Sequence, residues 1–130
     1  MFELARATRA ALLDHASEGA PEEVCGVLGG VVEEESIRAT THVPVENVAR
    51  TPETRYELDP AAQLAAMERI EDEGRAVVGF YHSHPRGPTG PSATDAAQAT
   101  WPGMRYVIVV PDESFVGCWL WDGEAFERET

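Results

Sequence analysis

Two histidines separated by one residue, His82 and His84, have the type and spacing that metal chemistry needs. On an extended backbone alternate side chains point to the same face, so the two imidazoles can bind one metal ion together. A His-x-His pair alone is a weak signal, because such pairs more often form hydrogen bonds than metal sites. A strand over 77–81 would hold the pair rigidly, and a loop after Pro85 would leave room for a ligand.

Asp95 is the third candidate ligand, and it follows Ser92 by three residues. A serine with an acid three residues later resembles a helix capping box, although that box prefers Glu or Gln at its last position. Ser92 therefore needs no catalytic role, and the charge of Asp95 in a first helical turn suits the helix dipole. Both interpretations can hold together, because a capped first turn is a stiff mount for a metal ligand.

Two histidines and one carboxylate leave the fourth tetrahedral position of one zinc ion (Zn²⁺) open, which is typical of catalytic rather than structural sites. That position would hold water, whose pKa zinc lowers from about 15.7 toward about 7. The chemistry also needs a carboxylate that accepts and returns a proton. Glu22 and Glu23 stand before a glycine-rich apolar stretch and are the candidates, although two solvated glutamates before a strand are the simpler local interpretation.

The elements that must position these residues follow from the spacing of apolar residues. Asp59-Pro60 is typical of a helix start and Gly74 of a helix end, and Leu64, Met67 and Ile70 would form the inward face between them. The predicted helices are 3–17, the segment from Asp59-Pro60 to Gly74, and 92–100; the predicted strands are 24–32, 36–45, 56–58, 76–81, 105–110, 114–121 and a last one after the Asp122-Gly123 turn. This pattern predicts an α/β fold, an α+β sandwich of a sheet with helices against it.

Length and charge limit the classes of function. The 130 residues predict one domain over 1–130, and the formal net charge is −13. Such a surface repels phosphate backbones, so we expect no nucleic-acid partner. No apolar stretch approaches the length of a membrane span, and no secretion signal begins the chain, so we expect no membrane partner and a cytoplasmic location. The sequence does not indicate the oligomeric state.

All ten basic residues are arginine. An acidic chain without lysine suggests a halophile with a salt-rich cytoplasm, because molar salt screens self-repulsion; an arginine-favouring genome is the alternative. Higher stability in molar salt than in dilute buffer is the result this hypothesis predicts.

Several further residues are assigned ordinary structural roles. Cys25 and Cys118 are read as small buried hydrophobes rather than a disulfide framework, although their pairing stays open. His15 and His42 have no partner at ligand spacing and are not expected to bind a metal. The tryptophans are expected in the core or on strand faces; they are Trp101, Trp119 and Trp121.

The combined pattern resembles the signature of the JAMM (MPN+) metalloproteases: His82-Ser83-His84, seven residues, Ser92, two residues, Asp95, with a glutamate upstream. The segment 21–28 looks like the opening strand of that family, in which the glutamate two residues before the cysteine is the general base. This alignment selects Glu23 over Glu22. The flanks resemble the small prokaryotic, archaeal-type branch at Asn47, Arg55-Tyr56 and Asp59-Pro60.

The resemblance implies a curved mixed sheet flanked by helices, the JAMM/MPN (cytidine-deaminase-like) architecture. It implies that His82, His84 and Asp95 bind Zn²⁺, that Glu23 moves the proton and that Ser92 donates to the oxyanion. The implied activity is cleavage after the C-terminal diglycine of ubiquitin-like modifier proteins, which releases them from lysine conjugates. Processing of sulfur-carrier C-termini is one alternative. A non-catalytic MPN scaffold is the other, and the complete set of site residues argues against it.

Overall fold

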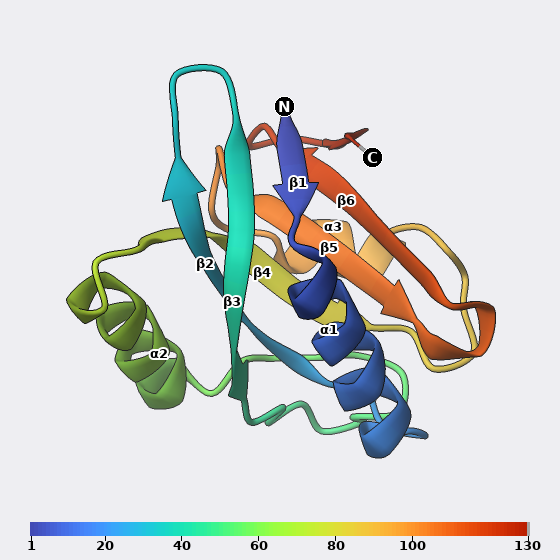
Figure 1. Cartoon of the computed structure of the whole chain (residues 1–130). Helices are drawn as coiled ribbons and strands as arrows, with labels where there is room; N and C mark the ends of the chain where they lie inside the picture. The colour runs from blue at the N-terminus through green and yellow to red at the C-terminus, as the bar shows by residue number, and fades with distance from the viewer. Residues whose placement is uncertain (130) are drawn as a thin grey trace.

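The computed structural model describes residues 1–129, and its centre is a curled, mixed sheet of seven strands in the order β1-β3-β2-β4-β5-β6-β7 (Figure 1). The pairs β1–β3 and β4–β5 are parallel, and the other neighbours are antiparallel. This confirms the predicted fold class. The strands are β1 Phe2–Leu4, β2 Cys25–Val32, β3 Ile37–Val45, β4 Ala76–Ser83, β5 Arg105–Val110, β6 Phe115–Trp121 and β7 Phe126–Arg128; the helices are α1 Arg6–Gly19, α2 Pro60–Asp72 and α3 Ala93–Gln98, with a 3-10 turn at Pro111–Glu113.

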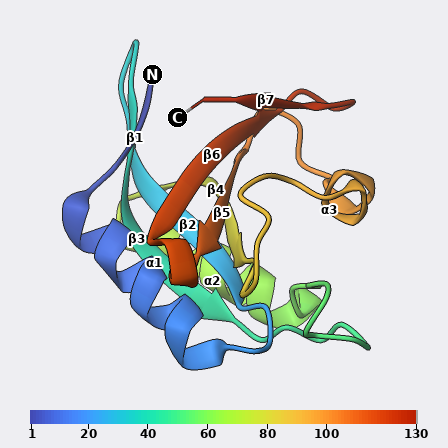
Figure 2. The ribbon, with the colours of Figure 1, turned by 90° about the vertical axis from the view of Figure 1, so that its right-hand side faces the viewer.

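The helices cover both faces of the sheet, with α1 on one side and α2 and α3 on the other (Figure 2). Leu12 and Ala16 of α1 are buried in one apolar cluster, and they lie four residues apart, on one face of the helix. Ala66 and Ile70 of α2 are buried in a second cluster on the opposite side of the sheet. The two faces of the sheet therefore have separate cores, and the central strands β2, β4 and β5 place side chains in both.

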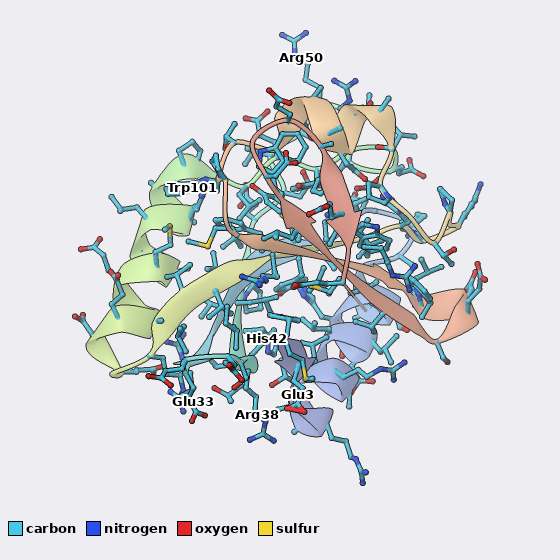
Figure 3. All side chains as sticks on the ribbon, turned by 90° about the horizontal axis from the view of Figure 1, so that it is seen from above. Glu3, Glu33, Arg38, His42, Arg50 and Trp101 are labelled. Carbon is cyan, nitrogen blue, oxygen red and sulfur yellow. The ribbon has the colours of Figure 1, made fainter. Side chains whose placement is uncertain are left out.

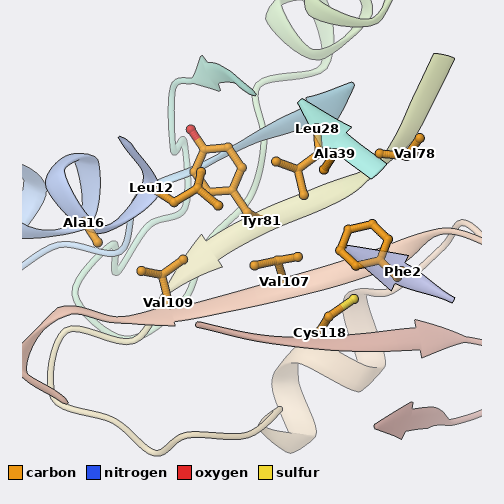
Figure 4. Packing of buried hydrophobic residues seen from close by; sticks show 10 residues of the cluster. All are labelled: Phe2, Leu12, Ala16, Leu28, Ala39, Val78, Tyr81, Val107, Val109 and Cys118. Atoms are coloured by element: carbon orange, nitrogen blue, oxygen red, sulfur yellow. The ribbon is translucent and has the colours of Figure 1, made fainter. Parts of the chain in front are cut away.

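Tyr81 lies in the core between α1 and the sheet, near Leu12 and Val109 (Figure 4). Its neighbours along β4, Phe80 and His82, point to the opposite face because side chains alternate along a strand. The last residues of β4 therefore divide into two sets. Phe80 and His82 face the side of α2 and α3, whereas Tyr81 and Ser83 face the side of α1.

A β-bulge at Val78 sets this alternation. The pairing of β2 with β4 shifts between Leu28, opposite Gly79, and Gly29, opposite Val77, so Val78 has no partner on β2. Val78 and Tyr81 both lie in the α1-side core although they are three positions apart, a spacing that plain alternation would place on opposite faces. A bulge inserts one extra residue and re-aims the side chains beyond it.

The N-terminal segment differs from the prediction of a helix over 3–17. Residues 2–4 form the edge strand β1, which pairs in parallel with β3, and Phe2 is buried. The Ala5 amide donates to the Ala39 carbonyl, and the helix begins only at Arg6. The spacing of Leu4 with later apolar residues fits a helix, but burial of Phe2 against the sheet outweighs that local preference.

Three further predictions were wrong in detail. Residues 56–58 form no strand, only a single bridge between Leu58 and Asn47. Trp101 is 40% exposed, whereas Trp119 and Trp121 are buried as expected. On α2, we predicted Leu64 on the inward face, but Leu64 is 60% exposed and Ala66 is buried instead. The Asp59 cap is confirmed, because its carboxylate accepts a hydrogen bond from the Ala62 amide at 2.9 Å.

The contrast on α2 predicts a stability difference. Ile70 is fully buried, so Ile70→Ala is expected to lower the free energy of unfolding by about 2–5 kcal/mol through lost burial and a cavity. Leu64→Ala on the same helix is the matched control, with an expected change of about 0.5 kcal/mol or less. Urea unfolding followed by circular dichroism measures both. Equal losses in the two variants would contradict this assignment of the helix faces.

Cys25 and Cys118 are both buried and free, as the reading of two small hydrophobes predicts. Within residues 1–129, no helix has both the length and the apolar character that crossing a membrane requires.

Candidate metal centre

Three of the predicted site residues converge in one buried cluster. The Nε2 atoms of His82 and His84 lie 3.2 Å apart, and Asp95 Oδ2 lies 3.1 Å from the first and 3.0 Å from the second. All three side chains are buried. Three donor atoms so close together, two of them on rings that can be unprotonated, form a pocket that a single cation would fill.

The cluster is built from the end of β4 and the start of α3. His82 is in β4, and His84 continues the ladder beyond it because its amide donates to the Val109 carbonyl at 2.9 Å. Ser92 and Asp95 form a capping box: Ser92 Oγ accepts from the Asp95 amide, and Asp95 Oδ2 accepts from the Ser92 amide. The helix cap and the ligand position therefore coexist, as the sequence suggested.

The tautomer of His84 is set by its other ring nitrogen. Nδ1 lies 2.8 Å from the carbonyl oxygen of Pro88, which can only accept a hydrogen bond. Nδ1 therefore carries a proton, and Nε2, which faces His82 and Asp95, is the nitrogen that would offer its lone pair to a metal ion. Such a bond to the remote nitrogen is how proteins commonly orient a histidine ligand.

Glu23 is brought to the cluster by the segment that leads into β2, two residues before Cys25. One ligand-type atom each from Glu23, His82 and His84 can be chosen within 4.8 Å of one another. Only 7% of Glu23 is exposed, and its Oε1 has no hydrogen-bond partner among residues 1–129. A buried carboxylate oxygen without a partner is costly, so it indicates a group that completes the site when the protein works.

The backbone around Glu23 is fixed from three sides. Its amide donates to the Pro52 carbonyl at 2.7 Å, and its carbonyl accepts from the Asn47 side chain at 2.8 Å. The next amide, that of Val24, donates to Ser83 Oγ at 2.8 Å. Asn47 and Ser83 are positioning residues that sequence reasoning missed. Asn47 appeared there only as part of a family resemblance, and Ser83 only as the residue between the histidines.

Tyr56 is a further residue to which sequence reasoning gave no role in the site. Its ring stacks on the His82 imidazole with centroids 4.1 Å apart and planes inclined by 16°. Tyr56 is itself buried, so it closes one side of the cluster to solvent. No spacing rule connects residues 56 and 82, because the contact depends on the path of the loop before α2.

The open side of the cluster faces a cleft of about 340 Å³. Glu23, His84 and Ser92 all line it, together with the rim residues Glu53 and Arg86. The Ser92 oxygen accepts from the Asp95 amide, so its hydroxyl proton remains available to a molecule in the cleft. All five predicted site residues therefore meet at one place.

The donor set fits a divalent transition metal. Two imidazoles and a carboxylate suit zinc. Tetrahedral ligation with bonds of about 2.0–2.1 Å sets ligand atoms about 3.3 Å apart, and the three donor atoms lie 3.0–3.2 Å from each other. The unpartnered Oε1 of Glu23 points to the same conclusion.

Comparison with known proteins places this geometry in a family. Residues 5–121 match the family model described as prokaryotic homologs of the JAB domain. The chain belongs to the prokaryotic JAMM (MPN+) family. The family resemblance drawn from the sequence is thereby confirmed, and the matched segment contains every residue of the cluster.

Curated JAMM relatives differ in how much of each protein is matched. The chain is 45% identical over 129 residues to a desampylase of Haloferax volcanii, covering 96% of this chain and 91% of that protein. It is 41% identical over 99 residues to the CysO-cysteine peptidase of Mycobacterium tuberculosis, covering 76% and 66%. It is 39% identical over 98 residues to a probable TtuB-protein conjugate cleaving protease of Thermus thermophilus, covering 75% and 62%.

A solved structure shares the fold over almost the whole chain. The solution structure of a protein from Desulfitobacterium hafniense superimposes with a TM-score of 0.89 at 29% identity, covering 99% of this chain and 90% of that one.

Burial and close contacts shift the pKa values of the residues in this cluster. Burial raises the pKa of Glu23 from its ordinary 4.5 to about 7, with the nearby His84 opposing and Asp95 adding to the rise. Burial would also raise the pKa of Asp95, but hydrogen bonds from His82 and His84 hold it well below its usual range. Burial lowers the pKa of His82. The cluster therefore combines one firmly ionised carboxylate with one that holds its proton near neutral pH.

The raised pKa of Glu23 predicts how the metal-free protein responds to pH. Between pH 4.5 and about 7 the folded state binds the Glu23 proton more tightly than the unfolded state, so rising pH destabilises the fold through this group. The Glu23→Gln variant lacks that titration. The melting temperature of the wild type minus that of the variant, both metal-free, should fall across this window and level off above it. A constant difference from pH 4.5 to 8 would contradict the assignment.

The other two histidines lie on the opposite face of the sheet. His15 Nδ1 is 2.9 Å from the Tyr81 hydroxyl, and the His42 ring lies 5.9 Å from the Tyr81 ring. Figure 3 shows His42 beside the sheet on the side of α1. Neither histidine reaches the JAMM cluster, which agrees with the expectation that they are not ligands.

Proposed function

We propose that this protein is a zinc-dependent hydrolase that cuts the peptide or isopeptide bond after the C-terminal diglycine of ubiquitin-like modifiers. The observation that carries the proposal is the convergence of His82, His84 and Asp95 with Glu23 at one cleft, where Glu23 retains an unpartnered oxygen. The names of the relatives support the substrate class, because they include a desampylase and a protease that cleaves protein conjugates.

Each residue has a distinct task in this proposal. His82, His84 and Asp95 would hold one Zn²⁺, which when bound supplies a Lewis acid that polarises a carbonyl and activates water at neutral pH. Glu23 accepts the proton of the attacking water on its carboxylate and delivers it to the leaving amine nitrogen. Burial raises its pKa to about 7 in the metal-free protein, which supports this role because both protonation states are then accessible near neutral pH. Ser92 donates its free hydroxyl proton to the carbonyl oxygen as negative charge develops there.

The depth of the cluster supports glycine at the scissile bond. His82, His84 and Asp95 are each less than 5% exposed, so the reacting carbonyl must enter deeply. The rigid proline rings at positions 21, 85 and 88 line the cleft above them. A chain with side chains next to the scissile bond would meet these walls, whereas glycine has no Cβ. An extended diglycine tail is therefore the substrate shape that this cleft favours.

A second candidate function shares the chemistry and differs in the substrate. The relationship to a CysO-cysteine peptidase favours removal of an amino acid or peptide from the C-terminus of a sulfur-carrier protein. A non-catalytic scaffold is disfavoured, because each of the four positions that catalysis would use is occupied by a competent side chain.

Two matched substrates test these functions. One is a small modifier joined through its diglycine to a lysine side chain, and the other is the same modifier with a short C-terminal extension after the diglycine. Mass spectrometry measures both cleavage rates with the zinc-loaded protein, after chelation and after zinc is returned. Chelation should stop cleavage and zinc should restore it. Faster cleavage of the first substrate supports the isopeptidase, faster cleavage of the second supports carrier processing, and no cleavage of either would refute the hydrolase.

A further inference from the structure

A second cavity, of about 280 Å³, lies next to the metal centre. Tyr56 lines this cavity and also stacks on His82, so one aromatic ring links the two sites. The cavity lies between the start of α2, which contributes Gln63, and the loop after α3, which contributes Trp101. Figure 3 shows Trp101 at the edge of the molecule near α2. The proposed reaction uses none of the residues in this cavity.

Four aromatic rings line the cavity: Tyr56, Phe80, Trp101 and Tyr106. The Phe80 ring lies 5.9 Å from that of Trp101 and 5.6 Å from that of Tyr106. The faces of aromatic rings carry negative potential and attract a cation placed over them, most strongly for tryptophan. Trp101 also keeps 40% of its surface exposed, so its ring is available to a ligand. We call this site the aromatic cavity.

The aromatic cavity also contains acceptors that lack donors. The side-chain oxygen of Gln98, Oε1, is buried and has no hydrogen-bond partner within residues 1–129. The exposed Glu57 carboxylate is at the rim of the cavity, and none of the ion pairs found among residues 1–129 involves it. A buried acceptor without a donor costs free energy, and an apolar guest would not relieve that cost. A guest with N–H groups would supply a donor that these acceptors lack, and the aromatic rings favour a guest that carries positive charge.

The wall of the aromatic cavity is held in place. The Tyr106 hydroxyl accepts hydrogen bonds from the backbone amides of Thr100, at 3.4 Å, and Trp101, at 3.2 Å. These bonds tie the loop after α3 to β5. A ligand would therefore meet a largely preformed site, and little of its binding free energy would be lost in ordering the loop.

We propose that the aromatic cavity binds a lysine or arginine side chain of the protein substrate, close to the bond that is cut. The inference rests on the proposed function, and it adds a preference for positively charged sequence beside the diglycine junction. The net charge of −13 supports it, because such a surface attracts cationic segments before they dock. The cation could come from the target protein or from the tail of the modifier.

Nuclear magnetic resonance tests binding without any cleavage. The indole N–H signal of Trp101 in ¹⁵N-labelled protein is followed while N-acetyl-arginine amide, N-acetyl-lysine amide or the neutral isostere N-acetyl-citrulline amide is added. The two cations should shift this signal and bind about fivefold more tightly than citrulline. The signals of Trp119 and Trp121, which do not line the cavity, should stay in place. Equal affinity for citrulline, or no shift with any ligand, would overturn the proposal.

Variants separate the charge of the site from its shape. Glu57→Gln keeps the size of the side chain and should weaken arginine binding about fivefold, to near the citrulline value. Glu68→Gln makes the same change of charge on the exposed surface of α2 and should leave binding unaltered. Equal effects of the two variants would show a general field of the acidic surface and overturn the assignment to the aromatic cavity.

Cleavage assays identify the source of the cation. Branched peptides carry a diglycine joined to a lysine side chain, with one arginine either in the target segment or in the modifier segment, and each is compared with its citrulline counterpart. The kcat/KM ratio of arginine to citrulline should be about fivefold in one of the two arms and close to unity in Glu57→Gln. No preference in either arm overturns the substrate role. Failure to cleave any peptide refutes the proposed function, while the resonance titration still decides whether a cation binds.

Discussion

Replacing Glu23 with glutamine is expected to lower the cleavage rate by about 10²–10⁴-fold while the zinc content stays near that of the wild type. Glutamine keeps the size and one oxygen of the side chain, but it cannot accept and return a proton. His82, His84 and Asp95 remain in place, so the metal should still bind. Mass spectrometry of the products and elemental analysis of the same sample measure the two quantities.

The neighbouring glutamate supplies the matched control. Glu22 is exposed and adjacent in sequence, so Glu22→Gln makes the same chemical change outside the cluster and should leave cleavage unaltered. The experiment also distinguishes two roles for Glu23. If Glu23 were a fourth protein ligand, Glu23→Gln would lose metal together with activity, and the site would be a closed structural one. A Glu23→Gln enzyme that cleaves at the wild-type rate would exclude both roles.

Replacing His82 with alanine is expected to abolish both zinc binding and cleavage. The substitution removes one of three donor atoms that lie within 3.2 Å of each other, and it leaves Asp95 with one imidazole partner. Loss of a group that only supports a ligand already lowers metal affinity by about 10–100-fold, so loss of the ligand itself should cost more. Added zinc should raise the melting temperature of the wild type and not that of the variant.

His42→Ala is the control for this experiment. His42 is also a histidine in the sheet, but its ring contacts Tyr81 on the face covered by α1. The His42 variant should therefore retain zinc, the zinc-dependent rise in melting temperature and cleavage. Zinc bound at wild-type stoichiometry in His82→Ala, or lost equally in both variants, would mean that the cluster at the end of β4 is not the metal centre.

The ligand cluster was predictable because its geometry is local in sequence. Two histidines at strand spacing and an acid in a capped first turn lie within fourteen residues, and both elements formed as expected. Glu23 is different, because it reaches the histidines only through the antiparallel pairing of β2 with β4, in which Cys25 lies opposite His82. Residue patterns did not determine that register. The resemblance to a family was needed to choose Glu23 over Glu22.

The remaining features depend on contacts between distant segments. Tyr56 reaches His82 from a segment for which the sequence predicted a short strand but which forms a loop. Asn47 supports Glu23 through hydrogen bonds to the carbonyls of Glu23 and Arg55. Trp101 was predicted in the core or on a strand face, yet it lies partly exposed in the loop after α3 and lines the aromatic cavity. Composition and periodicity describe the preference of one segment for one environment. They carry little information about which loop closes over which side chain.

The bulge at Val78 gives β4 one residue that its pairing with β2 does not use. Without Val78, Val77 and Gly79 would be consecutive and would oppose the consecutive residues Gly29 and Leu28, so the other side chains of β4 would keep their faces. A lineage could therefore shorten this strand by one residue and keep both its fold and its histidine pair. A second single deletion would turn the imidazoles to the side of α1.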